Sequence, residues 1–111
     1  MPILKLHVDR TCDARIDPEG VRTLLVDLRA ILCERLSSAE AACQLAWLPV
    51  TGLPDQPVVN CELAILPKPE RTREKLTELA EVLKARIEEV TGPKVAVRIS
   101  HLDAATYVAL K

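Results

Sequence analysis

The residue with the clearest chemical potential is Pro2, which follows Met1 and leads directly into an apolar strand pattern. A proline here favours removal of the initiator methionine, and the new N-terminus is then a secondary amine at the start of a strand. An α-amino group has a pKa of roughly 7.7–8.0, and burial or a nearby cation disfavours its charged form. An amine with a pKa near the working pH is an effective general base. The sequence therefore predicts Pro2 as a catalytic base. The alternative is an ordinary proline that serves only N-terminal processing.

Two strand-helix-strand patterns must position this residue. In the first, residues 3–8 alternate as a strand with one apolar and one mixed face. Asp17 and Pro18 then form a helix start, as N-cap and first helical residue, and leucine and isoleucine recur behind them at three- and four-residue spacing. Residues 41–50 follow as a strand in which Gln44 lies on the face opposite its apolar neighbours.

The second pattern repeats the first. It begins with a strand over residues 58–66 and continues, after a connector, with a helix that ends before Gly92. A strand over residues 94–100 completes the unit. The tail predicts one helical turn at residues 103–106 and a short final strand at residues 107–110.

The doubled pattern predicts one two-layer α+β domain over residues 1–111, with pseudo-repeat halves of about 1–54 and 55–111. Right-handed crossovers join parallel strands in such units, so a four-stranded sheet with both helices on one face would bury both apolar helix faces. The other sheet face and the open edges stay uncovered, which favours an oligomer. Residues 9–16 and 51–57 are rich in polar and turn-forming residues, and we expect loops there.

The composition excludes several classes of function. A net charge of −1 does not give the basic footprint of a nucleic-acid-binding protein. Charged residues interrupt the first ten positions, so no secretory signal peptide is expected. No apolar run approaches the roughly 20 residues of a membrane span. We therefore expect a cytoplasmic protein with no membrane or nucleic-acid partner.

The four cysteines are predicted to be buried, reduced thiols. Cys12, Cys33, Cys43 and Cys61 are widely spaced and form no Cys-x-x-Cys pair, whereas zinc sites usually show closely spaced ligand pairs. Free cysteine behaves as a small hydrophobic residue, and disulfides are uncommon in cytosolic proteins. The sequence predicts no metal site and no organic cofactor.

With these elements in place, the sequence resembles the tautomerase superfamily, in particular its trimeric 5-carboxymethyl-2-hydroxymuconate isomerase-like and macrophage migration inhibitory factor-like members. The likeness rests on Met1-Pro2, the doubled β-α-β plan and the chain length. Residues 68–72, Lys-Pro-Glu-Arg-Thr, lie where several members carry a basic residue followed by Gly-Arg-Ser. Residues 101–106, His-Leu-Asp-Ala-Ala-Thr, are similar to a stretch after the last strand of the migration-factor-like members.

The resemblance implies a homotrimer that moves a proton within a keto-enol or unsaturated keto acid, with Pro2 as general base and no cofactor. It implies that Arg71, with Lys68, binds the carboxylate of a small-molecule substrate and stabilises the developing enolate charge. Gln44 or Tyr107 is expected to donate a hydrogen bond to that enolate. No acid matches a water-activating role, so isomerisation is favoured over hydration.

Two positions depart from the family pattern and support other interpretations. The second strand lacks the arginine of isomerase-type members, and Glu70 replaces a glycine in the connector. One alternative is a catalytically silent trimeric module for binding or assembly. Another is a small ferredoxin-like domain that keeps Met1 and pairs with a larger partner. Arg71 stands at the predicted start of the second helix, where the helix dipole disfavours a cation. Carboxylate binding and surface exposure both stay open for it and for Lys68.

Overall fold

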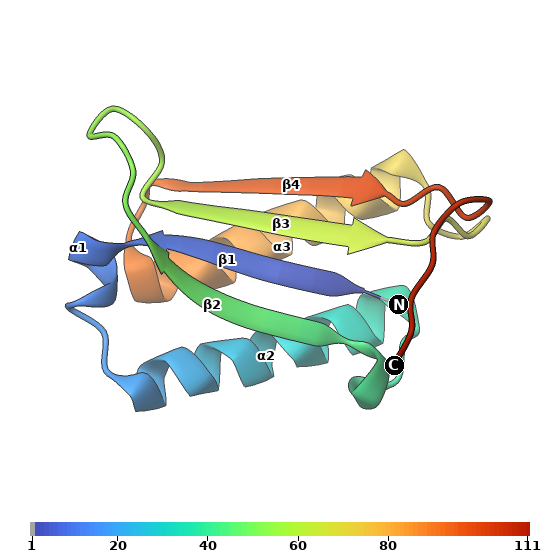
Figure 1. The fold of residues 1–111 in the computed structure, drawn as a ribbon, viewed down its shortest axis with the longest axis horizontal. Helices are drawn as coiled ribbons and strands as arrows, with labels where there is room; N and C mark the ends of the chain where they lie inside the picture. Colours follow the sequence, from blue (N-terminus) through green and yellow to red (C-terminus); the bar gives the residue numbers. More distant parts are fainter. Residues whose placement is uncertain (1) are drawn as a thin grey trace.

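The computed structural model describes residues 2–111, which form a four-stranded mixed sheet with two long helices packed on one face (Figure 1). The strands are β1 (Ile3–Asp9), β2 (Gln44–Val50), β3 (Val59–Ile65) and β4 (Val95–His101). The helices are α1 (Arg10–Asp13), α2 (Pro18–Leu36) and α3 (Arg73–Thr91), with a short 3-10 helix, η1, at Glu40–Ala42. The two-layer α+β fold predicted from the sequence is confirmed.

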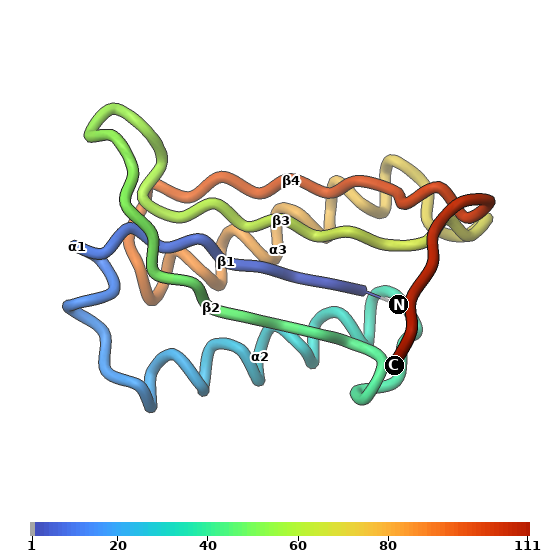
Figure 2. The backbone as a smooth tube through the Cα atoms, viewed as in Figure 1, coloured from blue at the N-terminus to red at the C-terminus, as the bar shows by residue number. Residues whose placement is uncertain are grey.

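The sheet order is β2-β1-β3-β4, and it joins two β-α-β units side by side. β1 runs parallel to β2 and β3 runs parallel to β4, as strands joined through a crossover helix do. The two units meet where β1 and β3 pair in the antiparallel sense. The chain passes from one unit to the other through the long loop after β2 (Figure 2). As a result, β1 and β3 lie at the centre of the sheet, and β2 and β4 are its edges.

Capping residues fix where the long helices begin and end. The Asp17 carboxylate accepts a hydrogen bond from the Gly20 N–H at 2.7 Å and so starts α2. This helix ends at Ser37, which adopts the left-handed conformation with φ 53°. Thr72 caps the start of α3, and Gly92 ends that helix with φ 98°, a conformation that glycine adopts without steric conflict.

The core lies between the sheet and the two long helices. The strands contribute every second side chain, namely Leu4, Leu6, Val8, Val59, Cys61, Leu63, Ile65 and Val95. The helices contribute a stripe of buried side chains, namely Leu24, Leu28, Leu32, Leu36, Leu79, Leu83 and Ile87. Removal of these side chains from water is the main favourable term in folding, and it aligns both helices under the sheet.

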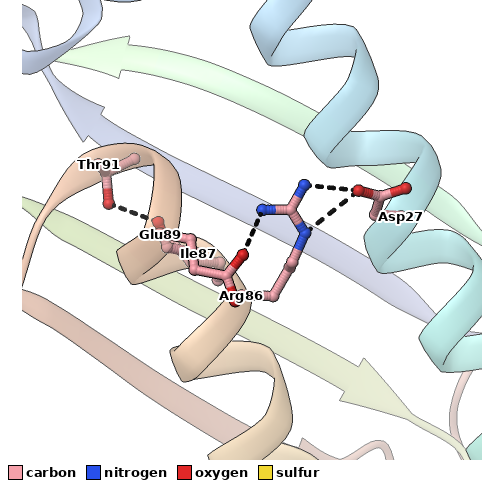
Figure 3. Close-up of polar contacts among 5 residues, drawn as sticks. All are labelled: Asp27, Arg86, Ile87, Glu89 and Thr91. Carbon is pink, nitrogen blue, oxygen red and sulfur yellow. Dashed lines mark hydrogen bonds and ion pairs between the residues drawn. The ribbon is translucent and has the colours of Figure 1, made fainter.

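A group of charged side chains joins the two helices (Figure 3). Arg86 of α3 donates from Nε and Nη2 to one carboxylate oxygen of Asp27 of α2, at 3.1 and 2.6 Å. Its other terminal nitrogen donates to Glu89 at 3.2 Å. Near the end of α3, the hydroxyl of Thr91 donates to the carbonyl of Ile87 at 3.0 Å. The contact between Arg86 and Asp27 links residues far apart in sequence and ties α2 to α3.

The sheet face turned away from the helices carries a mixed set of side chains. Lys5, Glu62 and Arg98 lie next to one another on β1, β3 and β4, so charge alternates across three strands. Arg98 also donates to the side-chain oxygen of Asn60 at 2.9 Å. No element within residues 2–111 covers this face (Figure 1), as expected from the presence of only two long helices.

The predicted loop over residues 9–16 contains the four-residue helix α1. Asp9 starts it by accepting hydrogen bonds from the N–H and the hydroxyl of Thr11, at 3.0 and 2.7 Å. The helix is shorter than two turns, so apolar periodicity gave no sign of it. Asp13 of α1 accepts a hydrogen bond from the indole N–H of Trp47 at 2.7 Å, which fastens α1 to β2.

The tail differs from its prediction in one respect. Residues 103–106 form the expected turn, and the Tyr107 N–H donates to the carbonyl of Asp103 at 2.9 Å. Residues 107–110 do not form the predicted strand, because the tail leaves the sheet after β4 and passes across the end of the strands (Figure 1). None of the helices in residues 2–111 is both long and apolar enough to cross a membrane.

Candidate active site

The end of the sheet where β1 begins is the meeting point of four strand ends. β2 also begins there, and β3 and β4 both end there. The C-terminal tail reaches the same end (Figure 1). The predicted site residues all fall near these strand ends: Pro2 before β1, Gln44 at the start of β2, Lys68 and Arg71 after β3, and Tyr107 after β4.

Pro2 is buried immediately before β1, and its carbonyl oxygen accepts a hydrogen bond from the Gln44 N–H at 3.0 Å. If the strand registers are extended by one residue, Pro2 lies between Cys43 and Ile65. It also continues the alternation of buried side chains in β1, so its ring is on the helix side of the sheet. Met1, whose removal would free the amine, lies outside the described residues.

Gln44 approaches Pro2 through its backbone. Its side chain is exposed and lies on the same sheet face as its strand partner Ile3, because directly paired residues project to the same side. That face is opposite the one that Pro2 continues. Within one chain, strand alternation therefore turns the Gln44 amide away from the position expected of a donor to an enolate beside Pro2.

Arg71 is only 5% exposed and directs its guanidinium group at two backbone carbonyls. Nη1 donates to the carbonyl of Leu66 at 2.7 Å, and Nη2 donates to the carbonyl of Leu36 at 3.2 Å. Leu36 is the last residue of α2, where carbonyls lack partners within the helix and a cation is favoured by the helix dipole. The guanidinium group thus fastens the end of α2 to the connector between β3 and α3.

The charge of Arg71 is not neutralised by an acidic side chain. It forms no ion pair with any carboxylate of residues 2–111, and its buried Nε has no hydrogen-bond partner among them. Burial of a cation without a counter-ion is unfavourable, and it leaves a positive potential in a region where water screens little. Such a potential attracts an anion.

Lys68 and Tyr107 flank this region without a hydrogen bond to Pro2 within residues 2–111. Lys68 is exposed, and its carbonyl accepts a hydrogen bond from the Arg71 N–H at 2.9 Å, which forms a tight turn in the connector. Tyr107 is half-buried in the tail. A hydrogen bond of 2.7 Å from the Leu102 N–H to the carbonyl of Ile65 anchors the start of that tail beside the end of β3.

No model of a protein family matches the sequence, and no curated protein matches it either. Solved structures do match. The F6 fused 4-OT wild-type asymmetric trimer has a TM-score of 0.77 and 14% identity, over 96% of this chain and 91% of that chain. The macrophage migration inhibitory factor-like protein of Entamoeba histolytica has a TM-score of 0.75 and 10% identity, over 97% and 94%. Pt0534 inactivated by 2-oxo-3-pentynoate has a TM-score of 0.72 and 15% identity, over 95% and 89%. The chain has the tautomerase fold.

The resemblance to the tautomerase superfamily, expected from the Met1-Pro2 start and the doubled unit, is confirmed at the level of the fold. At identities this low the likeness extends to the fold alone. It does not carry a catalytic role to any side chain. The roles of individual residues therefore depend on the chemistry of this chain.

Sequence reasoning missed a close thiol pair at the same end of the tautomerase fold. The Sγ atoms of Cys33 and Cys43 are 3.9 Å apart, and the Cys43 thiol also donates to the carbonyl of Ala39 at 3.5 Å. All four cysteines are free, as predicted; three are buried and Cys33 is half-buried. Burial, together with the hydrogen bond to Cys33, raises the pKa of the Cys43 thiol to about 11. The short connection from α2 to β2 was the only sequence signal that these two cysteines meet.

Proposed function

We propose that the protein is a cofactor-independent tautomerase in which Pro2, once Met1 is removed, acts as the general base. The amine takes a proton from the carbon α or γ to the carbonyl of a small keto or enol acid and returns it elsewhere on the conjugated system. The observation that carries the proposal is the position of Pro2, buried before β1 and held by the Gln44 N–H, at the sheet end that also holds the uncompensated guanidinium of Arg71.

Two properties of this position favour a neutral amine. Burial disfavours the ammonium form, and so does a positive charge in the same region; both effects lower the pKa of an amine. Arg71 supplies that charge permanently, since guanidinium does not lose its proton in proteins. The same charge stabilises an enolate more than the neutral ketone from which it forms, which is the electrostatic requirement for catalysis.

The proposed roles of the other residues differ. Lys68 is exposed and binds the substrate carboxylate directly as a point charge. Arg71 is buried and acts on the substrate through the field of its positive charge. Tyr107 donates its hydroxyl proton to the enolate oxygen. Gln44 is a positioning residue, because its backbone N–H fixes the carbonyl of Pro2.

We also propose that the protein assembles as a homotrimer. β2 and β4 are edge strands with backbone groups available for pairing, and no described element covers the mixed sheet face turned away from the helices. F6 fused 4-OT, which has the same fold, is a trimer. A second copy paired with β2 would also bring new side chains to the sheet edge one strand away from Pro2.

Covalent labelling tests the proposal directly. Pt0534 is inactivated by 2-oxo-3-pentynoate, which combines a carboxylate with an alkyne carbon that a neutral amine attacks. Protein made without an N-terminal tag and shown by intact mass to lack Met1 should gain one reagent per chain, and peptide mapping should place it on Pro2. A matched protein with one extra N-terminal residue, in which the Pro2 nitrogen is an amide, should remain unlabelled at Pro2. Labelling confined to cysteines, or none at all, would contradict the proposal.

A second candidate function is a catalytically silent trimeric module for binding or assembly. It is favoured by one specific observation, that both terminal nitrogens of Arg71 already bind the carbonyls of Leu66 and Leu36. This arrangement gives the arginine a structural role that needs no substrate. A stable trimer whose Pro2 amine is free but fails to react would support this module.

A further inference from the structure

The thiols of Cys33 and Cys43 are placed for covalent bond formation. Their Sγ atoms are 3.9 Å apart, and the sulfurs of a disulfide are about 2.05 Å apart. Cys33 lies in the last turn of α2, and Cys43 lies immediately before β2. The Cys33 side chain is half-buried, whereas Cys43 is 8% exposed. Closing the remaining gap of about 2 Å brings the end of α2 and the start of β2 slightly closer together.

We propose that Cys33 and Cys43 are a reversible disulfide site, oxidised by a small disulfide of the glutathione class. The Cys33 thiolate attacks one sulfur of glutathione disulfide, which forms a mixed disulfide and releases one glutathione. Cys43 then attacks the sulfur of Cys33 and releases the second glutathione. Two protein thiols are oxidised by two electrons, one glutathione disulfide is reduced to two thiols, and the two protein protons pass to the departing glutathione thiolates.

The assignment of the two steps follows from exposure. Cys33 is the more accessible thiol and meets the oxidant first. Cys43 is shielded from a bulky disulfide but lies within reach of Cys33, so it is the resolving thiol. Burial, followed by the contact with Cys33, raises the pKa of the Cys43 thiol, and the nearby charge of Arg29 acts in the opposite direction.

The two remaining cysteines are internal controls. Cys61 lies in the middle of β3 and is fully buried. Cys12 lies in α1, at the other end of the sheet, and its thiol donates to the carbonyl of Thr91 at 3.9 Å. Neither is within contact of another thiol in residues 2–111, so neither can close an intramolecular disulfide.

The pair lies where oxidation would affect Pro2. Cys43 is opposite Pro2 in the extended β1–β2 register, and the next residue, Gln44, donates the hydrogen bond that holds the Pro2 carbonyl. Formation of the disulfide draws the start of β2 toward α2 and shifts this N–H. Oxidation therefore slows the reaction of the Pro2 amine. This consequence rests on the proposed function, whereas formation of the disulfide does not depend on it.

Mass spectrometry of the folded, full-length protein tests the disulfide. After incubation with glutathione disulfide, the chain should lose two hydrogen atoms, Cys33 and Cys43 should appear in one cross-linked peptide, and dithiothreitol should reverse the change. Cys12→Ala should behave like the wild type. Cys33→Ser and Cys43→Ala should each abolish the cross-link. A persistent glutathione adduct on wild-type Cys33, or four thiols still free after oxidation, would overturn the proposal.

The labelling rate of Pro2 tests the regulatory consequence. The oxidised protein should react with 2-oxo-3-pentynoate several-fold more slowly than the reduced protein, and Cys33→Ser should not respond to oxidant. An equal rate in both states would overturn the regulatory part. If Pro2 stays unlabelled in both states, the proposed function is wrong, and the mass measurement still decides whether the disulfide forms.

Discussion

The guanidinium group of Arg71 donates a hydrogen bond to the carbonyl of Leu36 and thereby joins the connector after β3 to the end of α2. Arg71 is adjacent to Thr72, the N-cap of α3, where the dipole of that helix does not stabilise a cation. The guanidinium group is stabilised instead by the C-terminal end of α2, where the helix dipole favours a cation. One side chain thus braces two elements at the sheet end that holds Pro2.

Loss of this brace should be measurable as a loss of stability. Arg71→Met should lower the free energy of unfolding by about 2–4 kcal/mol, because the carbonyls of Leu36 and Leu66 each lose a charged donor. Urea denaturation measures the change. Arg73→Met, at an exposed position two residues on, is the matched control and should change stability by less than about 0.5 kcal/mol. Equal effects of the two substitutions would show that Arg71 does not brace the fold.

The pairing of Arg86 with Asp27 should contribute a smaller, specific coupling between α2 and α3. The side chains are 25% and 44% exposed, so water screens part of their attraction. A double-mutant cycle with Arg86→Ala and Asp27→Ala should give a coupling free energy of about 0.5–1.5 kcal/mol. The cycle of Arg86 with the more exposed Glu89 should give less than about 0.5 kcal/mol. A larger coupling to Glu89 than to Asp27 would contradict this geometry.

The buried thiol of Cys61 should make stability fall at high pH. Burial raises its pKa from 9.0 to about 12, with a further contribution from the charge of Glu62. In the unfolded chain the thiol ionises near its ordinary value, while in the folded protein it stays protonated. As pH rises, the thiol therefore ionises first in the unfolded chain, which favours unfolding. The stability that Cys61 contributes is fully present below the ordinary thiol pKa and is lost as pH rises toward 12.

Comparison with Cys61→Ala isolates this effect from other titrating groups. The difference in unfolding free energy between the wild type and Cys61→Ala should shrink by about 2 kcal/mol between about pH 8.5 and pH 10.5. Guanidinium denaturation at several pH values measures it. A difference that stays constant over this range would mean that the thiol is not desolvated.

The elements of the fold could be predicted because each has a local signal. Alternation around Leu4 and Leu6 gave β1, and the pair Asp17-Pro18 gave the start of α2. α1 was missed because a helix of four residues has no apolar period. The predicted final strand at residues 107–110 was wrong, since alternation alone does not distinguish a strand from a tail that has no strand to pair with.

The candidate site was harder to predict because its contacts cross the fold. The unfavourable position of Arg71 beside the second helix was visible in the sequence, but its contact with Leu36 depends on how α2 packs. The sheet face on which the Gln44 side chain lies within β2 was predicted correctly. Its position relative to Pro2 could not be, because it depends on the register in which β1 and β2 pair. The contact between Cys33 and Cys43 likewise depends on the turn that joins α2 to β2.

The most direct test of the central claim is the kcat/KM for ketonisation of the enol of an aryl α-keto acid such as phenylpyruvate. The comparison uses untagged wild type and Pro2→Ala, both shown by mass to lack Met1 and by size-exclusion chromatography to share one oligomeric state. If Pro2 is the general base, Pro2→Ala should lower kcat/KM by about 10²–10⁴-fold. Equal values for the two proteins would contradict the proposal that Pro2 is the base.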